Sequence, residues 1–218
     1  MKESEIIAKT AEYVKSRLLG EVTGHDWWHV YRVWQNALQI SRHEKGVDML
    51  VVQLGALLHD IADYKFHGGS TDKGVRIATK LLRRLGLDQQ ATGKICQIIS
   101  EISFKGAGVR DRMSSKEGEI VQGADRLDAI GAIGIARVFA YGGYKDRPIY
   151  DPDEKPVYHK SFESYFNGKS TSINHFHEKL LLLRRRMKTR SGREMAAERD
   201  RYMRAYLRRF FLEWKGRK

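Results

Sequence analysis

The sequence predicts an all-α protein. Only three of its 218 residues are proline, and long stretches carry apolar residues at the spacing of one helical face. The glycines gather at a few points, such as 106–118 and 142–143, where loops between helices are expected. The length suits one domain with a substantial core, so we expect residues 1–218 to form a single domain.

Five helices are expected in the N-terminal half. Asp26 and Asp88 are suitable N-caps, and Gly20 and Gly86 are suitable stops. Together with the apolar periodicity, these signals place the helices at residues 4–19, 27–43, 48–62, 71–85 and 88–100.

The C-terminal half is expected to combine helices with longer loops. Small and aliphatic residues alternate over 119–134, as in a closely packed helix, although this segment also carries Asp125, Arg126 and Asp128. The apolar stripes of the last two helices indicate core packing or the surface of a homodimer. The pattern places loops at 104–118 and 141–156, and helices at 161–166, 172–188 and 193–214.

The third helix delivers two polar residues to its end. The apolar run Val51–Leu58 is typical of a buried helix, and His59 and Asp60 follow it directly. Neighbouring helix positions point about 100° apart, so both side chains reach one point only from the rim of a cleft between helices. A buried carboxylate beside an imidazole is costly unless a cation or hydrogen bonds compensate it. A hydrogen-bonded histidine and a solvated aspartate at a helix end are the alternative.

The second helix also carries a polar face. His29 lies four residues after His25 and three before Arg32, so these side chains can line one side of a cleft. A packed core histidine among the neighbouring tryptophans is the alternative. In the same way, a salt bridge or an N-cap would account for Asp125 in its apolar segment.

The formal net charge of +13 is concentrated from Arg184 onward. Such a basic stretch can bind nucleic acid, attract a polyanionic small substrate, or serve as a solvated face. The first residues lack a signal-peptide core, and no apolar run approaches membrane-spanning length. The single Cys96 excludes an internal disulfide and fits a reducing compartment. We therefore expect a cytoplasmic protein without membrane contact.

Four side chains from three separate helices occur in the order His29, His59, Asp60, Asp125. Two imidazoles and two carboxylates suit Mn²⁺, Fe²⁺, Co²⁺, Ni²⁺, Zn²⁺ or Mg²⁺, with positions left for water and substrate. A cation there would neutralise both carboxylates, polarise a phosphoryl oxygen and lower the pKa of bound water. The set therefore predicts a divalent metal site between helices.

Longer motifs around these residues resemble a known family. They are HDWWHVYRV at 25–33, LLHDIAD at 57–63, ADRLDAIGAIG at 124–134, YGG at 141–143 with RPIYDP at 147–152, and HEKLLLL at 177–183 followed by Gly192-Arg193. Over residues 24–214 the chain is similar to the HD-domain metal-dependent phosphohydrolases, in the bacterial YpgQ/YedJ-type branch.

The resemblance implies a fold, a cofactor and a reaction. The fold is the all-α HD fold, with an HD core at about 24–140 and a C-terminal helical pair at about 172–215. The cofactor is one divalent metal ion, most often Mn²⁺. The reaction is hydrolysis of nucleoside and deoxynucleoside triphosphates to monophosphate and pyrophosphate. By position, the family's metal ligands match His29, His59, Asp60 and Asp125.

Two further carboxylates are candidates for catalysis. Asp63 falls where related HD pyrophosphohydrolases place an acidic residue that handles the attacking water, but the next position, acidic in that group, is Tyr64 here. Asp63 is therefore our candidate general base. Asp128 lies one turn beyond Asp125 and is the other candidate, with the orientation of a ligand histidine or an arginine as its alternative role.

A triphosphate also requires cationic side chains. Arginine suits a bidentate grip on phosphate oxygens, and lysine acts as a point charge. Ordinary salt bridges are the alternative for each candidate. The candidates nearest to the site in sequence are Arg32, Lys65, His67, Arg126 and Arg147, with His25 as a further phosphate or supporting contact.

Other functions compete with nucleotide pyrophosphohydrolysis. The same fold could act as a phosphomonoesterase or a cyclic phosphodiesterase, which release different products. A basic nucleic-acid-binding or regulatory HD protein is another alternative, but the chain shows no recognised nucleic-acid-binding motif. A purely structural helical protein would leave the carboxylates of 119–134 unexplained. The expected partner is therefore a nucleotide, with nucleic acid as the less favoured one.

Overall fold

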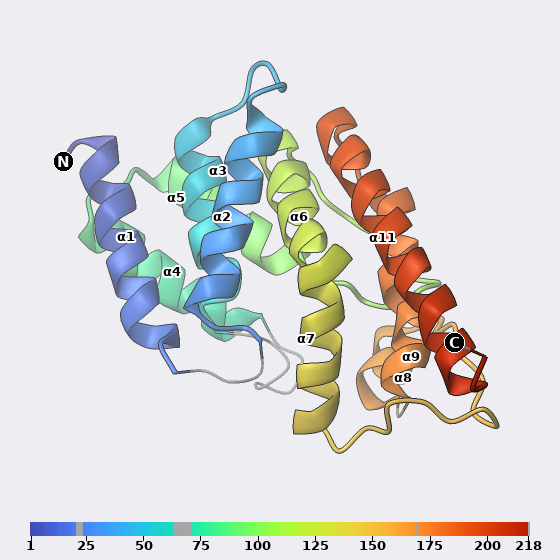
Figure 1. Ribbon diagram of the computed structural model, residues 1–218. Helices are drawn as coiled ribbons and strands as arrows, with labels where there is room; N and C mark the ends of the chain where they lie inside the picture. Colours follow the sequence, from blue (N-terminus) through green and yellow to red (C-terminus); the bar gives the residue numbers. More distant parts are fainter. Residues whose placement is uncertain (21–23, 63–70, 169, 218) are drawn as a thin grey trace.

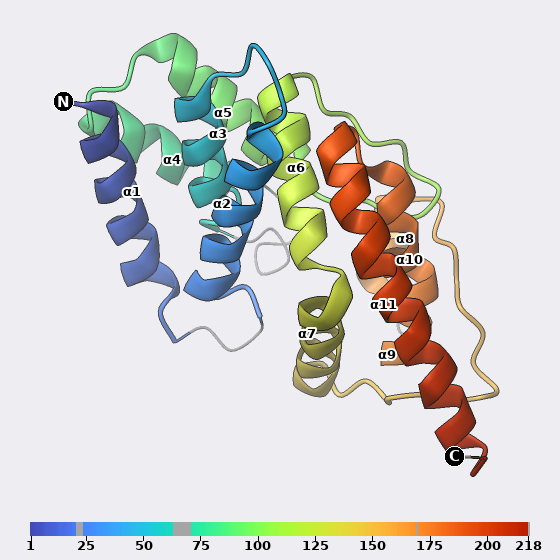
Figure 2. The ribbon, with the colours of Figure 1, turned by 45° about the horizontal axis from the view of Figure 1, so that its top comes forward.

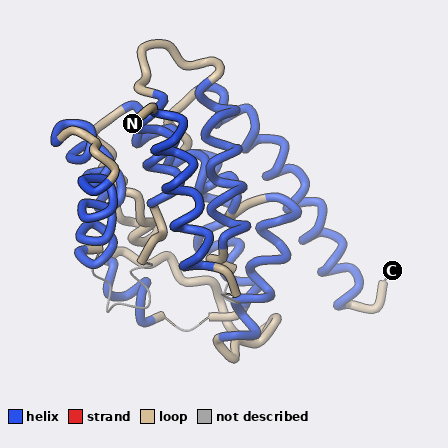
Figure 3. The backbone as a smooth tube through the Cα atoms, turned by 90° about the vertical axis from the view of Figure 1, so that its left-hand side faces the viewer, coloured by secondary structure: helices blue, strands red, loops and turns tan. Residues whose placement is uncertain are grey.

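The computed structural model describes residues 1–20, 24–62, 71–168 and 170–217, and in these ranges it consists of helices joined by loops (Figures 1 and 3). No strand occurs within the described ranges, so the predicted all-α fold class is confirmed. None of the helices there combines the length and apolar character needed to cross a membrane. The elements are α1 (Glu3–Leu18), α2 (Trp27–Ser41), α3 (Met49–Leu58), α4 (Asp72–Arg84), α5 (Gln89–Glu101), α6 (Lys116–Asp128), α7 (Gly131–Tyr144), α8 (Phe162–Asn167), α9 (Ser172–His175), the π-helical turn η2 (Phe176–Leu180), α10 (Leu181–Leu183), the 3-10 turn η3 (Arg184–Arg186) and α11 (Arg190–Trp214).

Helix α3 lies at the centre of the core. It packs against α1, α2, α5 and α6, and α2 packs against α6 as well. Figures 1 and 2 show α2, α3 and α6 side by side, with α1 on one side and α7 and α11 on the other. Val51, Leu54, Leu57 and Leu58 have no exposed surface. The apolar run of α3 therefore forms the buried helix that the sequence predicts.

The helix ends follow local hydrogen bonding. Asp26 accepts a hydrogen bond from the backbone N–H of His29 at 2.9 Å, and Asp88 accepts one from Ala91 at 2.8 Å. Both aspartates thereby satisfy N–H groups that the first turn of a helix leaves unpaired, as predicted. Helix α3 ends at Leu58, so His59 and Asp60 stand at its rim.

The segment 119–134 is not one continuous helix, which corrects the expectation from its composition. Helix α6 ends at Asp128, and α7 begins at Gly131, where the backbone φ is +78°. This left-handed conformation favours glycine, because other residues place a Cβ against the backbone. The break redirects the chain, and α7 also extends to Tyr144, into the stretch expected to be a loop.

Residues 172–188 also depart from the predicted single helix. The chain there forms α9, the π-helical turn η2, α10 and the 3-10 turn η3 in succession. Helix α11 follows and packs against α6 and α7, and its C-terminal end projects beyond the rest of the molecule (Figure 2). The chain before α11 is therefore a succession of short turns and not the single helix expected from the apolar stripe.

The central position of α3 predicts a large stability cost for Leu54→Ala. The substitution removes buried methyl groups and leaves a cavity, so the free energy of unfolding should fall by about 2–5 kcal/mol. Urea unfolding followed by circular dichroism, with a chelator present, measures this change. Met49→Ala on the same helix is the control, because Met49 is 38% exposed and should change stability by about 0.5 kcal/mol or less. Equal losses in the two variants would contradict the assigned core.

Candidate active site

Three helices bring the predicted metal ligands together. His29 lies in the first turn of α2, which Asp26 caps. His59 and Asp60 follow the end of α3, and Asp125 lies in the last turn of α6. Because α2, α3 and α6 pack against one another, these ends meet at one rim of the core.

The distances confirm that the four side chains converge. The Nε2 atom of His29 lies 3.2 Å from His59 Nε2 and 3.3 Å from Asp60 Oδ2. It lies 3.6 Å from Asp125 Oδ1, and His59 Nε2 lies 3.9 Å from the same oxygen. Nitrogen and oxygen atoms this close to one another could hold one metal ion between them.

Hydrogen bonds on the far side of each imidazole fix the direction of its inner nitrogen. His29 Nδ1 lies 2.7 Å from Asp128 Oδ2, and His59 Nδ1 lies 2.8 Å from the carbonyl oxygen of Ala56. Since both partners accept hydrogen bonds, both Nδ1 atoms donate, and the Nε2 lone pairs point inward. This is the arrangement by which histidine ligands are oriented in metal sites. The donor set therefore fits a divalent cation, and His29, His59 and Asp125 could hold one together with Asp60.

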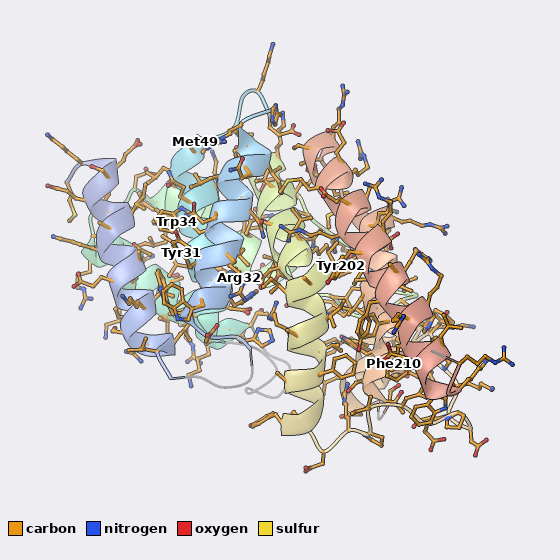
Figure 4. The ribbon with its side chains drawn as sticks, in the orientation of Figure 1. Tyr31, Arg32, Trp34, Met49, Tyr202 and Phe210 are labelled. Carbon is orange, nitrogen blue, oxygen red and sulfur yellow. The ribbon has the colours of Figure 1, made fainter. Side chains whose placement is uncertain are left out.

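Asp128 connects this centre to two arginines. Its Oδ1 accepts a hydrogen bond from Arg32 Nε at 2.6 Å, and its Oδ2 accepts one from Arg137 Nη1 at 2.9 Å. Arg32 extends from α2 toward α6 (Figure 4). Burial by itself would raise the pKa of Asp128, but the hydrogen bonds from His29 and Arg32 outweigh it and hold this pKa well below its ordinary value. Asp128 is therefore an anion that is hydrogen-bonded to His29, and a catalytic role for it stays a prediction.

Asp60 is held by histidines from two directions. His25 Nδ1 lies 2.8 Å from Asp60 Oδ2, the same oxygen that faces His29. Burial would raise the pKa of Asp60, but His59, His25 and His29 together keep it well below its ordinary value. The same contacts act on His29: burial and Arg137 lower its pKa, while the hydrogen bonds to Asp128 and Asp60 outweigh them and raise it. A cation at this centre would compete with that proton.

The cluster of candidate ligands borders a cavity of about 360 Å³, a size typical of small-molecule sites. Asp60, Asp125 and His25 form part of its wall. Its cationic side chains come from α6, from α7, from the loop after α7 and from η2, and they are Arg126, Arg137, Lys145, Arg147 and Lys179.

Of the phosphate contacts predicted from the sequence, His25, Arg126 and Arg147 line this cavity. The guanidinium of Arg126 also pairs with Asp111 at 2.9 Å. Arg32 lies beside the centre, paired with Asp128. Contact with a substrate stays a prediction for all four. The candidates in the segment after α3, namely Asp63 with its neighbour Tyr64, Lys65 and His67, lie outside the described residues.

The cavity wall includes residues that the sequence did not single out for binding. Arg137, Lys145 and Tyr141 lie on or next to α7, and Phe104 and Glu178 come from elsewhere in the chain. Sequence position alone did not separate Arg147 from Arg137 and Lys145. All three line the cavity because α7 continues beyond the end of α6 and carries this part of the chain along it (Figure 1).

Comparison with known proteins defines the class. The family model of the HD domain matches residues 27–130. The chain is 36% identical over 209 residues to the YpgQ protein of Bacillus subtilis, an alignment that covers 95% of this chain and 93% of that protein. The chain therefore belongs to the HD-domain family, whose members bind divalent metals.

Solved structures with the same fold agree with this assignment. A Lactobacillus plantarum protein aligns with a TM-score of 0.87 at 32% identity, and the alignment covers 99% of this chain and 100% of that protein. An HD-superfamily hydrolase from Bacillus thuringiensis aligns with a TM-score of 0.75 at 36% identity, covering 98% and 99%. Bacillus subtilis YpgQ in complex with ADP aligns with a TM-score of 0.74 at 32% identity, covering 97% and 100%. The resemblance inferred from the motifs is confirmed, and the class is that of the HD-superfamily hydrolases.

The contact between Asp128 and His29 predicts that Asp128→Asn weakens metal binding. The asparagine amide must turn its NH₂ group toward either His29 or the arginines, all of which donate hydrogen bonds. Loss of such a supporting contact typically reduces metal affinity by about 10- to 100-fold. Titration of the metal-free protein with Mn²⁺ in a calorimeter measures this.

Asp200→Asn is the matched control for this measurement. Asp200 is equally buried and also joins two arginines, Arg184 and Arg204, but it contacts none of the four candidate ligands. Asp200→Asn should lower stability and leave Mn²⁺ affinity unchanged. If both variants bind the metal as tightly as the unmodified protein, Asp128 does not position His29.

Proposed function

We propose that the protein is a metal-dependent phosphohydrolase that cleaves nucleoside triphosphates, deoxy forms included, to monophosphate and pyrophosphate. The observation that carries this proposal is a cluster of two histidines and two aspartates, Asp60 and Asp125, in which both aspartates line a cavity that is also lined by cations. Such a cavity combines a place for a divalent ion with a place for a chain of phosphates.

The cations of the cavity favour a polyanionic substrate. Arg147 and Lys145 lie over the ring of Tyr141, at 5.7 Å and 6.0 Å from its centroid. Within the described ranges, neither of them has a carboxylate within ion-pair distance. Cations that line a cavity without an acidic partner attract anions into it. A triphosphate carries several negative charges along its chain of phosphates.

A relative supports the nucleotide part of the proposal. YpgQ of Bacillus subtilis, which shares the fold and about a third of the sequence, has a structure in complex with ADP. We extend this ligand class to the present chain. The expected metal is Mn²⁺, because a nitrogen and oxygen donor set accepts it and the sequence resembles a branch that often uses it.

Different residues of the chain would have different roles in this reaction. When bound, the metal ion would polarise a phosphoryl oxygen and lower the pKa of a water molecule. His29, His59, Asp60 and Asp125 would hold the ion. Lys145 and Arg147 would hold the phosphates against it.

Asp63 is our candidate for accepting the proton of the attacking water. This assignment rests on its position in the sequence motif, three residues after Asp60.

A panel of metals and nucleotides tests the proposal. The protein is freed of metal by chelation, supplied with Mn²⁺, Mg²⁺, Co²⁺, Ni²⁺ or Zn²⁺, and incubated with ribonucleoside and deoxynucleoside triphosphates. Chromatography should detect monophosphate and pyrophosphate in equal amounts, with Mn²⁺ as the best metal. Asp60→Ala should reduce the rate by at least about 100-fold, since it removes a ligand of the metal that activates the water. Release of orthophosphate alone, or turnover that survives chelation, would contradict the proposed reaction.

Replacement of Asp63 by asparagine separates proton transfer from metal binding. A general base typically accelerates a reaction by about 100- to 10,000-fold, so kcat should fall within this range. Mn²⁺ affinity should not change, because Asp63 is not a proposed ligand. Asp153→Asn, at an exposed position of the loop after α7, is the control. An unchanged kcat would remove Asp63 from the mechanism and leave the metal site untouched.

A further inference from the structure

A buried carboxylate in the cavity has no role in the chemistry described above. Glu178 is 3% exposed and lines the cavity, yet it is not a proposed metal ligand. It lies in the π-helical turn η2, between α9 and α10. Such turns are rare and frequently occur at functional sites.

One oxygen of Glu178 is fixed by the protein. Glu178 Oε1 accepts hydrogen bonds from the backbone N–H of Val157 at 2.9 Å and from the hydroxyl of Ser170 at 2.7 Å. Throughout the described residues, no donor reaches Oε2. Among the described residues, the fully buried side-chain atoms that lack a hydrogen-bond partner do not include Oε2, so this oxygen keeps accessible surface where Glu178 lines the cavity. A carboxylate held in place with one oxygen uncommitted, at the wall of a cavity, therefore indicates a ligand that donates a hydrogen bond.

Aromatic side chains line the same cavity. Phe104 is almost buried, and its ring makes an edge-to-face contact with Tyr165, with 5.2 Å between centroids. The ammonium of Lys179 lies 5.4 Å from the centroid of Phe104. Apolar ring surface with a few fixed polar groups is the usual composition of a site for a flat organic ligand.

The charge of Glu178 determines which part of a nucleotide can lie beside it. A phosphate would be repelled by the carboxylate, whereas a sugar hydroxyl or a base N–H would donate to it. The phosphates have cations of their own in the same cavity, at Lys145 and Arg147. A nucleotide with its phosphates at Lys145 and Arg147 and its nucleoside at Glu178 is therefore favoured over the reverse orientation.

On this basis, and resting on the proposed function, we propose that Glu178 recognises the nucleoside half of the substrate. Its Oε2 accepts a hydrogen bond from an O–H or N–H of the sugar or base, and the rings of Phe104 and Tyr165 contact the nucleoside. Glu178 thereby determines which nucleotides bind and in which direction.

Glu178→Gln tests this role. A glutamine can still accept the hydrogen bonds from Val157 and Ser170 through its oxygen, but it then presents an NH₂ donor to the cavity. The kcat/KM for the best nucleoside triphosphate should fall about 10- to 100-fold, mainly through KM, as expected when a hydrogen bond to a charged group is lost. The inhibition constant of inorganic tripolyphosphate, which has no nucleoside, should change less than about 2-fold, because its contacts lie elsewhere.

The matched control is Glu101→Gln. Glu101 also accepts hydrogen bonds from a backbone N–H and a serine hydroxyl, both of Ser114, but it does not line the cavity. This variant should keep the kcat/KM of the unmodified protein. Circular dichroism and thermal unfolding check that both variants fold.

Substrate analogues identify the donor and keep the test valid if Glu178→Gln does not fold. In the unmodified protein, ATP is compared with its 2′-deoxy and 3′-deoxy analogues and with the purine analogue that lacks the 6-amino group. Removing the group that donates to Glu178 should cost about 10-fold or more in kcat/KM. In Glu178→Gln, the same removal should cost almost nothing, because the two changes abolish one interaction.

Three results would overturn the inference. The first is a Glu178→Gln variant with unchanged KM for every nucleotide. The second is an equal rise in the inhibition constant of tripolyphosphate, which would make Glu178 a general support of the cavity. The third is an unmodified protein that discriminates against none of the analogues. Failure of the proposed function itself has a different signature, because the unmodified protein would then hydrolyse no nucleoside triphosphate.

Discussion

The packing of α2 against α3 and α6 is the constraint on which the candidate site depends. His29, His59 and Asp125 come from these three helices, and each of them stands at or near a helix end. A shift of one helix by a single turn, about 5.4 Å, would separate donor atoms that now lie within 3.9 Å of one another. The buried leucines of α3 therefore do more than stabilise the fold, since they set the distances of the centre. Asp128 adds a second link, because it holds His29 and the guanidinium groups of Arg32 and Arg137 at the same time.

The basic C-terminal third contributes both internal ion pairs and exposed charge. Arg184 and Arg204 pair with the buried Asp200, and Arg199 donates to the side chain of Asn36 and to the carbonyl of Leu127. The contacts of Arg199 tie α11 to α2 and α6, two of the helices that carry the site. Arg201 and Arg208 face solvent instead, and the labelled Tyr202 and Phe210 mark the length of α11 along which these charges lie (Figure 4). The net charge therefore reflects both internal ion pairs and a solvated face.

The irregular segment after α9 shows how a local departure from helical geometry serves the cavity. A regular helix over 172–188 would repeat its apolar positions every 3.6 residues and bury only one stripe. In the π-helical turn, Phe176, Glu178 and Leu180 are all buried. The turn carries a buried carboxylate at the wall of the cavity, beside Ser170 and Lys179. The motif at 177–183 contains this residue, but the helical pattern of the motif does not predict that Glu178 lines the cavity.

Sequence patterns alone determined the helical class, the N-caps at Asp26 and Asp88, the burial of α3 and the set of four candidate ligands. These features depend on local hydrogen bonding, on apolar periodicity or on motifs of a few adjacent residues. All of these can be recognised from neighbouring residues in the sequence. Tertiary structure decided the break at Gly131, the role of Asp128 behind His29, and the cavity wall that includes Arg137, Lys145 and Glu178. Those features depend on which side chains from different helices meet. The packing of the whole core determines these contacts, and the separation of two residues in the sequence does not predict them.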